Sequence, residues 1–265
     1  MMKITCDTFW LPKAGNHPNE YEDAWAISYI PVGSNEVKHC TDQTFTGVVS
    51  EFRCAIADGA TETSFSGEWA DVLVKSFVTH GNVRSNFLAD ENLRLLQEEW
   101  HLRIDEKTRD KPLPWYAQEK LQQGAYSTLT GLQIFHNSGW EMTSVGDSAC
   151  LLKRQSGKRW GKYPHNIEFT NHPFLISTDR ARNVGLGQHQ YHIPKAETWQ
   201  IGDTFYLMTG ALADYLFNLR GKQHLLNKLM QGQQQFEDEI HKLRQEKKCK
   251  NDDVTLVKIA VTTED

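Results

Sequence analysis

The alternation of apolar and polar positions predicts strands first and helices next. An alternating pattern at 4–11 and an apolar run at 24–30 predict two early strands, and a third strand ends with the apolar residues 54–57. Apolar residues then recur at helical spacing over 67–80 and 90–104. These two segments are therefore expected to be helices that cover the core.

The period of the pattern changes again after a third predicted helix at 115–123. Runs at 129–135 and 140–154 predict consecutive antiparallel strands joined by tight connections. Residues 155–200 are rich in Gly, His, Asn and Pro, which indicates a long surface excursion with short strands. The remaining segments are predicted to be a strand at 205–208, helices at 211–219, 223–230 and 235–246, and a closing β-rich run at 249–261.

Acidic residues stand where the predicted strands begin or end. Asp58 directly follows the third strand and precedes Gly59, whose missing side chain lets a backbone carbonyl approach a ligand. Each acid alone has a plainer explanation, such as an Asx turn or a solvated loop. Equivalent ends of neighbouring strands meet at one sheet edge, however, so one cation could collect carboxylates from several strands. The acids in question are Glu22, Asp23, Asp58, Asp147, Asp252 and Asp253.

A ligand set of carboxylates without His or Cys favours Mg²⁺ or Mn²⁺ over Zn²⁺. Two such ions about 3.5 to 4 Å apart, sharing a bridging carboxylate, would activate a water for attack on a phosphate. We therefore expect chemistry on a phosphate ester. Four histidines lack the spacing of zinc ligands and are expected to lie mostly at the surface: His165, His172, His189 and His192.

Length, composition and charge narrow the class of protein. The chain has 265 residues, of which 39% are hydrophobic, and we expect a single domain over 1–265. The net charge of -5 gives no overall field that would favour nucleic acid or an anionic membrane. The chain has five cysteines without a CxxC pair, and it has no apolar run near the roughly 18 residues needed to cross a bilayer. These features predict a soluble, cytoplasmic protein.

The order of short motifs along the chain resembles that of the metal-dependent serine/threonine protein phosphatases, the protein phosphatase 2C-like (PPM) family, in its compact bacterial branch. The motifs are ED at 22–23, ADG at 57–59 followed by SGEWA, GAYSTLTGL at 124–132, SVGDSACLL at 144–152, LMTGALADYLF at 207–217 and NDDVTLV at 251–257. The resemblance extends from about Cys6 to Val261. It implies an α+β fold, a four-layer α-β-β-α sandwich in which two antiparallel sheets pack face to face and helices flank them.

The resemblance also implies the roles of the acids. Asp58 would bridge two Mg²⁺ or Mn²⁺ ions, and the Gly59 carbonyl and Glu22 would complete one of them. Asp23 would act largely through bound water, and Asp252 would hold the other ion. The remaining pair, Asp147 and Asp214, would recruit a third, weaker cation. Metal-bound water would attack a phosphorylated Ser or Thr of a protein substrate, with a cognate kinase as a further partner and the chain acting as a monomer.

Three positions depart from the family pattern, and all of them fall at the site. Gly210 stands where the family has a metal-binding Asp, Ala60 where many members have a His, and Pro18 where many members have a phosphate-binding Arg. Lys13 or His17 could serve as the phosphate contact instead, although Lys13 is better explained as a solvated loop lysine. The loss at position 210 weakens a shared dication site, so reduced turnover is expected.

Two other functions stay open at this point. One is a pseudophosphatase that binds a phosphoprotein through the cleft or through the 155–200 excursion, and the loss of an acid at Gly210 favours it. The other is a metal-dependent nuclease, because clustered acids also suit phosphodiesters. The net negative charge of the chain and the lack of a basic stripe with interleaved aromatic residues argue against a nuclease.

Overall fold

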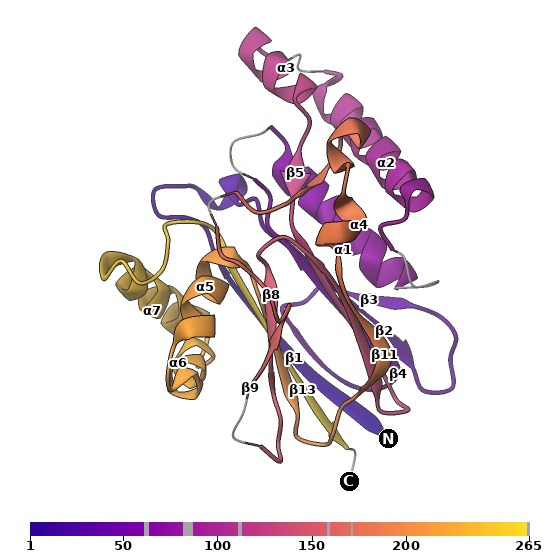
Figure 1. The fold of residues 1–265 in the computed structure, drawn as a ribbon, viewed down its shortest axis with the longest axis vertical. Helices are drawn as coiled ribbons and strands as arrows, with labels where there is room; N and C mark the ends of the chain where they lie inside the picture. Colours follow the sequence, from indigo (N-terminus) through magenta and orange to yellow (C-terminus); the bar gives the residue numbers. More distant parts are fainter. Residues whose placement is uncertain (61–63, 82–86, 111–112, 158–159, 171, 264–265) are drawn as a thin grey trace.

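One large, curled antiparallel sheet forms the centre of the molecule, and helices lie on two sides of it (Figure 1). The computed structural model describes residues 1–60, 64–81, 87–110, 113–157, 160–170 and 172–263. The strands of the main sheet are β1 (Met2–Leu11), β2 (Ala24–Pro31), β3 (Lys38–Cys40), β4 (Thr44–Ala57), β6 (Leu129–Phe135), β7 (Gly139–Val145), β8 (Ala149–Lys153), β9 (Trp160–Tyr163), β11 (Tyr191–Thr198), β12 (Thr204–Met208) and β13 (Val254–Thr263). The short strands β5 (Tyr126–Ser127) and β10 (Ile176–Ser177) pair with each other.

The helices fall into two groups (Figure 1). The first group comprises α1 (Ser66–His80), α2 (Asp90–Thr108) and α3 (Trp115–Gln122). The second comprises α5 (Gly210–Asn218), α6 (Lys222–Leu229) and α7 (Gln233–Gln245). The shorter helical segments are the 3-10 turn Pro18–Glu20, the 3-10 turn Arg180–Asn183 and α4 (Leu186–His189). None of the helices in the described part of the chain has the length and apolarity needed to span a membrane.

The long strand β4 makes the sheet curl, because it changes partners along its length. Its first residues pair with β1, with Phe45 opposite Cys6. Its second half pairs with β2 on one side and β6 on the other, with Cys54 opposite both Ile27 and Leu132. The sheet order is β11-β7-β6-β4-β1-β13-β12-β8-β9, so one hydrogen-bonded network connects its two halves.

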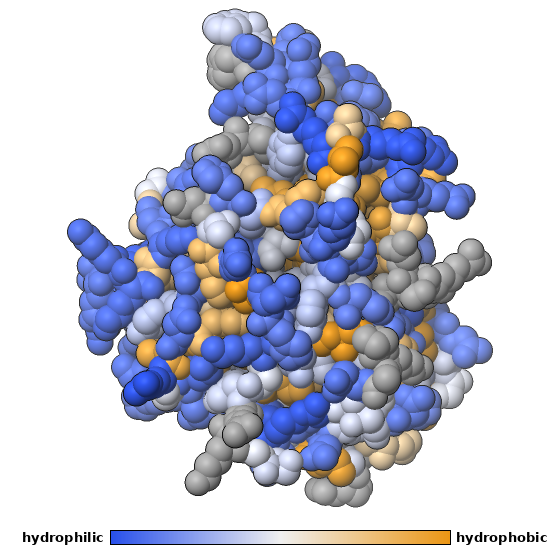
Figure 2. Space-filling view, in the orientation of Figure 1, coloured by the Kyte–Doolittle hydropathy of each residue, from blue (hydrophilic) through white to orange (hydrophobic). Residues whose placement is uncertain are grey.

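Three apolar clusters occupy the spaces between these layers. The inner cluster joins the two halves of the sheet: the Trp140 ring of β7 lies 5.2 Å from the Phe205 ring of β12, centroid to centroid. A second cluster lies under α1 and α2 and includes Trp69 and Trp100. A third lies under α5, α6 and α7 and includes Phe236. The surface in Figure 2 is largely hydrophilic and is interrupted by separate apolar patches.

Most of the elements expected from periodicity are present, and one connection differs from expectation. The predicted run 140–154 is two strands, β7 and β8, separated by a turn that contains Asp147, as its Gly-Asp-Ser sequence indicates. However, these two strands do not pair: β7 pairs with β6 and β11, whereas β8 pairs with β12 and β9. The turn therefore carries the chain from one half of the sheet to the other, where Asp147 can meet acids from both halves.

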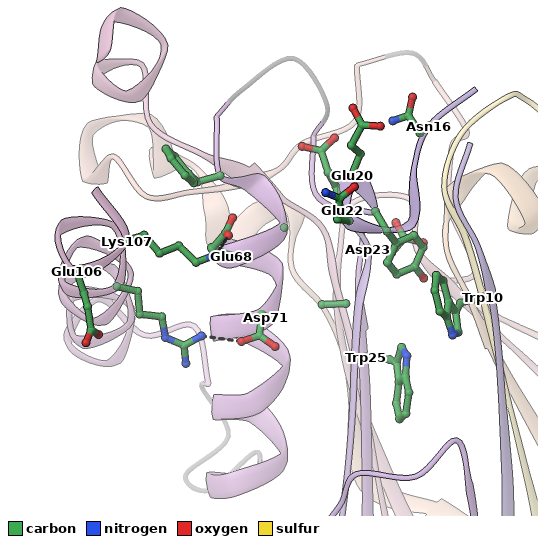
Figure 3. Close-up of a pocket in the computed structure, with 16 residues that line it drawn as sticks. Trp10, Asn16, Glu20, Glu22, Asp23, Trp25, Glu68, Asp71, Glu106 and Lys107 are labelled. Atoms are coloured by element: carbon green, nitrogen blue, oxygen red, sulfur yellow. Dashed lines mark hydrogen bonds and ion pairs between the residues drawn. The ribbon is translucent and has the colours of Figure 1, made fainter. Parts of the chain in front are cut away.

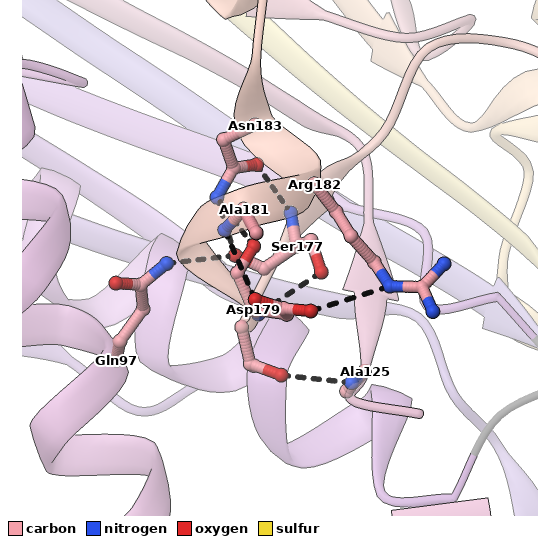
Figure 4. Close-up of polar contacts among 8 residues, drawn as sticks. Gln97, Ala125, Ser177, Asp179, Ala181, Arg182 and Asn183 are labelled. Atoms are coloured by element: carbon pink, nitrogen blue, oxygen red, sulfur yellow. Dashed lines mark hydrogen bonds and ion pairs between the residues drawn. The ribbon is translucent and has the colours of Figure 1, made fainter. Parts of the chain in front are cut away.

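The 155–200 excursion contains β9, β10, α4 and β11, and part of it is fixed to the body of the protein (Figure 4). The Gln97 amide of α2 donates to the Ser177 carbonyl at 3.1 Å, and the Ala125 N–H donates to the Thr178 hydroxyl at 2.9 Å. The Asn183 side chain accepts from the Ser177 N–H at 2.8 Å. These bonds hold Ser177 and Thr178 in place, shortly after Leu175, which lines the cavity described below.

Helix α1 packs so closely on the sheet that a side chain at position 131 has no room. A Cβ on Gly131 would lie 2.5 Å from the Phe77 ring. We expect Gly131→Ala to lower the free energy of unfolding by about 1–3 kcal/mol, because overpacking forces backbone or side-chain shifts. Gly187→Ala is the matched control, since no atom lies within 4 Å of that Cβ.

Urea unfolding of both single variants and of Gly131→Ala combined with Phe77→Leu measures the effect. The double variant is expected to lose less than the sum of its single changes, because the smaller side chain relieves the collision. Strictly additive losses would show that the two residues do not interact as described.

Candidate metal centre

Asp58 is held at the end of β4 by backbone contacts on both sides. Its N–H donates to the Thr128 hydroxyl at 2.9 Å, and its carbonyl accepts from the Thr128 N–H and from the Ser127 hydroxyl, each at 2.9 Å. Gly59 passes between two other segments: a Cβ there would lie 2.7 Å from the Glu22 carbonyl oxygen and 2.8 Å from the Ser66 carbonyl carbon. Only glycine fits this crossing, which brings the ends of β4 and β2 together.

A cavity of about 480 Å³ opens beside Asp58. Asp147, Asp252 and Gly210 line it as well, so the structure brings together three of the acids expected from the sequence. The turn that carries Asp147 is tied to the Asp58 backbone through one chain of hydrogen bonds. In this chain the Thr128 hydroxyl, which accepts from Asp58, also lies 2.7 Å from the Ser148 hydroxyl.

The Asp147 carboxylate occupies the space beside Gly210. A Cβ at position 210 would lie 2.5 Å from Asp147 Oδ2. Burial raises the pKa of the Asp147 carboxyl to about 6; among nearby charges, Lys250 lowers it whereas Asp252 and Asp214 raise it. An acid at position 210 would therefore require Asp147 to move.

Asp23 is buried with only one of its two carboxylate oxygens satisfied. The hydroxyls of Thr209 and Thr255 both donate to Asp23 Oδ2, at 3.0 Å and 2.6 Å. Asp23 Oδ1 is buried without a hydrogen-bond partner, and the residue is 6% exposed. Burial, and then repulsion from Asp253, raises the pKa of the Asp23 carboxyl well above its usual value. A buried carboxylate oxygen needs a hydrogen-bond donor or a cation beside it, and Asp23 Oδ1 is such an oxygen.

Glu22 does not line the cavity beside Asp58. Together with Asp23 it lines a separate, open cavity of about 1010 Å³, bounded by α1, α2 and the segment before β2 (Figure 3). Trp10 and Trp25 line the same cavity. The expected ligands are therefore divided between two neighbouring cavities, with Glu22 and Asp23 in one and Asp58, Asp147 and Asp252 in the other.

Asp253 holds the segments around the site together. Its carboxylate accepts from the Lys13 N–H at 2.8 Å and from the Glu22 N–H at 2.6 Å. The Lys13 residue lines a third cavity of about 370 Å³, and not the cavity beside Asp58. Burial raises the pKa of Asp252, and the positive charge of Lys13 counteracts this. Lys13 thus lies near the acids, but its N–H has a structural role.

Asp214 lies in the second turn of α5 and is partly exposed to solvent. Its side chain is 37% exposed, and its Oδ2 is 3.9 Å from Lys250 Nζ. Lys250 also lines the cavity beside Asp58 and contributes the one Lys or Arg side chain among the described residues that line it. Lys250 was not expected from the sequence; its position two residues before Asp252 was the available signal.

Loss of hydration, and after it repulsion among the acids, dominates the electrostatics of the site. Loss of hydration, and then repulsion from Asp23, Asp147 and Asp252 in turn, raises the pKa of the Asp58 carboxyl well above its usual value. Carboxylates forced into such proximity need a compensating positive charge. The arrangement can therefore bind a hard cation, or it can bind protons.

The donors fit a divalent cation in chemistry, since they are all oxygen atoms and Asp23 Oδ1 is unsatisfied. Yet within the described ranges no three His, Cys, Asp or Glu side chains converge closely enough to hold one ion. Binding would therefore require the ion to draw carboxylates from the two cavities together.

Thr209 and Thr255 are the other residues of the site that were not expected from the sequence. Both threonines lie inside motifs noted in the sequence: Thr209 directly precedes Gly210 in LMTGALADYLF, and Thr255 follows Asp252 by three residues in NDDVTLV. A buried acid needs donors behind it, so a Thr next to a strand-end motif is the kind of signal that could have found them.

The raised pKa of Asp147 makes the metal-free protein less stable as the pH rises. Because the folded pKa of about 6 exceeds the unfolded value of about 3.8, folding favours the protonated form. The free energy of unfolding should fall as the pH rises from about 4 to about 6.5, by roughly 2–3 kcal/mol from this residue. Asp58 and Asp23 act in the same direction.

Asp147→Asn removes this titration, so its unfolding free energy should depend less steeply on pH over that range. Urea unfolding in EDTA at a series of pH values measures the two slopes. Equal slopes in the variant and the wild-type protein would contradict the account of Asp147.

Comparison with known proteins identifies the family. The Protein phosphatase 2C family model matches residues 35–247, which include Asp58, Asp147 and Asp214 but neither Glu22 nor Asp252. A search of curated proteins found no match.

Several solved structures have a similar fold. RsbX in complex with magnesium is 18% identical, with 98% of this chain and 96% of that chain covered, at a TM-score of 0.50. The catalytic domain of the serine/threonine protein phosphatase PstP in complex with two manganese ions is 14% identical, with 99% and 100% covered, at 0.52. The Mycobacterium tuberculosis phosphatase PstP/Ppp is 13% identical, with 98% and 100% covered, at 0.53. Because the family model matches well over half of the chain, the protein belongs to the protein phosphatase 2C family.

Proposed function

We propose that the protein is a Mg²⁺- or Mn²⁺-dependent serine/threonine phosphoprotein phosphatase. The observation that carries the proposal is that Asp58, Asp147 and Asp252 line one cavity, while Oδ1 of Asp23, which lines the other cavity, is buried and unsatisfied. Such a site has more negative charge than its surroundings offset, and divalent cations bound there would also attract a phosphate dianion. Family membership and the magnesium and manganese complexes of the similar structures support this choice of ion.

Two ions are proposed. Asp58 would bridge them, with Glu22 and the Gly59 carbonyl completing one site and Asp252 the other, while Asp23 acts through water. When bound, the metals supply an activated water and neutralise the negative charge of the phosphate ester. Asp147 and Asp214, which the resemblance assigns to a weaker ion, lie toward Lys250.

The residues of the chain position this chemistry. Thr209 and Thr255 fix one oxygen of Asp23 and leave the other directed away from them. Thr128 and Ser148 set the spacing between the Asp58 strand end and the Asp147 turn. Gly210 provides no carboxylate, so weaker binding of one ion and reduced turnover are part of the proposal.

The finer architecture and the biological setting belong to the same proposal. A four-layer α-β-β-α sandwich is supported by the inner cluster around Trp140 and the two outer clusters under the helices. We propose one domain over 1–265, acting as a monomer on a phosphorylated protein, with a cognate kinase opposing it. Five free cysteines, including the buried Cys54 and Cys150, suit a reducing compartment such as the cytoplasm.

A pseudophosphatase is the second candidate, because one observation favours it. In the part of the chain described, no three potential ligands converge on a single point, and Gly210 removes a carboxylate. A module of this kind would bind a phosphoprotein without requiring metal. Titration with Mn²⁺ and then with a phosphopeptide distinguishes the two candidates. A phosphatase hydrolyses the phosphopeptide only when Mn²⁺ is bound, whereas a pseudophosphatase binds the phosphopeptide without Mn²⁺.

Asp58→Asn tests the proposed function directly. We expect the wild-type protein to hydrolyse a phosphopeptide and an aryl phosphate with added Mn²⁺, and the variant to lose about 100-fold or more of this activity, since even the residues behind metal ligands typically contribute 10- to 100-fold. Mn²⁺ should also raise the melting temperature of the wild-type protein and not that of the variant.

Asp238→Asn, at an exposed position on α7, is the matched control and should retain both responses. Wild-type rates equal to a metal-free blank on both substrates would contradict the phosphatase proposal and leave the binding module. Gly210→Asp then asks whether a restored acid raises the rate, given that Asp147 must first move aside.

Thr255→Val tests the support behind Asp23. Removing this hydroxyl leaves Asp23 with one donor, and we expect Mn²⁺ affinity to fall about 10-fold, as is usual for the loss of a group that orients a metal ligand. Isothermal titration with Mn²⁺ measures the change. Thr262→Val, whose hydroxyl donates to the Lys3 carbonyl far along β13, is the control. An unchanged affinity in Thr255→Val would exclude Asp23 from the metal site.

A further inference from the structure

Lys250 places a fixed positive charge at the wall of the acidic cavity. It lies in the connection between α7 and β13, and its side chain is 47% exposed. Its Nζ is 3.9 Å from Asp214 Oδ2, within the range of an ion pair and beyond that of a strong hydrogen bond. The three N–H donors of the ammonium group therefore remain able to reach a second acceptor.

Asp147 lines the same cavity as Lys250. Asp214 lies one helical turn after Gly210 on α5, and Asp147 lies directly against Gly210. Among the neighbouring charges, Lys250 lowers the pKa of the Asp147 carboxyl, whereas Asp252 and then Asp214 raise it. Asp147, Asp214 and Lys250 therefore form one electrostatic group, next to Asp252 at the cavity wall.

Gly210 determines how many acids share this group. Gly210 contributes no carboxylate, and a Cβ there would collide with the Asp147 carboxylate, so the group beside Lys250 contains two acids, Asp147 and Asp214. Two acids and one lysine leave a single negative charge. A divalent cation placed there would be attracted by this single negative charge and repelled by the Lys250 ammonium.

We propose that the Lys250 ammonium is the resident cation of Asp147 and Asp214, and that this pair therefore holds the lysine in place of a divalent ion. This inference rests on the proposed function in one respect: it takes from it that the divalent ions are bound by Asp58 and Asp252, deeper in the site. Divalent ions are confined to those deeper acids, and the lysine keeps a positive charge at the cavity wall where a phosphate would enter.

The competing explanation is an ordinary surface ion pair between Lys250 and Asp214. Such pairs between partly exposed side chains contribute little, and removing one leaves neighbouring sites unchanged. The two explanations differ in what happens to metal stoichiometry when the lysine loses its charge.

Isothermal titration with Mn²⁺ counts the ions bound by the wild-type protein, Lys250→Met and Lys250→Arg. Lys250→Met keeps the length of the side chain and removes its charge, so it should bind one more Mn²⁺ per chain than the wild-type protein, more weakly than any ion already present. Lys250→Arg retains the charge and should show the wild-type number. Adding Asp214→Asn to Lys250→Met should remove the extra ion.

Equal numbers of Mn²⁺ ions in Lys250→Met and the wild-type protein would overturn the inference, as would an extra ion that persists without Asp214. Urea unfolding of each variant in EDTA establishes that all of them are folded. A wild-type protein that binds no Mn²⁺ at all would overturn the proposed function alone, because the inference about Lys250 is measured by the difference between the two proteins.

Discussion

Carboxylates that share a poorly hydrated site repel one another, and this repulsion is the constraint on which the rest of the structure depends. The charges of Asp23, Asp147 and Asp252 each raise the pKa of Asp58, after the loss of hydration itself. A fold gains nothing from gathering these groups unless protons or cations offset their charge. The protein holds them together all the same, which indicates that the acids serve binding and not stability.

The curled sheet creates this gathering and hydrogen bonds maintain it. The turn between β7 and β8 crosses from one half of the sheet to the other, so Asp147 reaches the end of β4. Thr128 links that strand end to the turn, while Thr209 and Thr255 hold Asp23 from the opposite half. Asp253 fastens the backbone of Glu22. Each acid is thus fixed through a neighbour, so metal binding and backbone geometry are coupled.

Much of this arrangement could be predicted from local sequence. The apolar run before Asp58 and the glycine after it specify a strand end with a close crossing, and both are present. The division of Glu22 and Asp58 between two cavities could not be predicted, because it depends on how β2 and α1 pack. Nor does local sequence reveal that Asp147 fills the space beside Gly210, or that Lys250 faces Asp214, since both contacts join segments far apart in the chain.

The most direct test of the account is a crystal soaked in Mn²⁺ and measured at the manganese absorption edge. The account predicts anomalous density within about 2.1–2.3 Å of a carboxylate oxygen of Asp58, with Asp252 or Glu22 drawn toward it. Anomalous density that is absent from the cavity, or that lies beyond coordination distance of Asp58, would contradict the central claim that these separated acids cage a divalent ion.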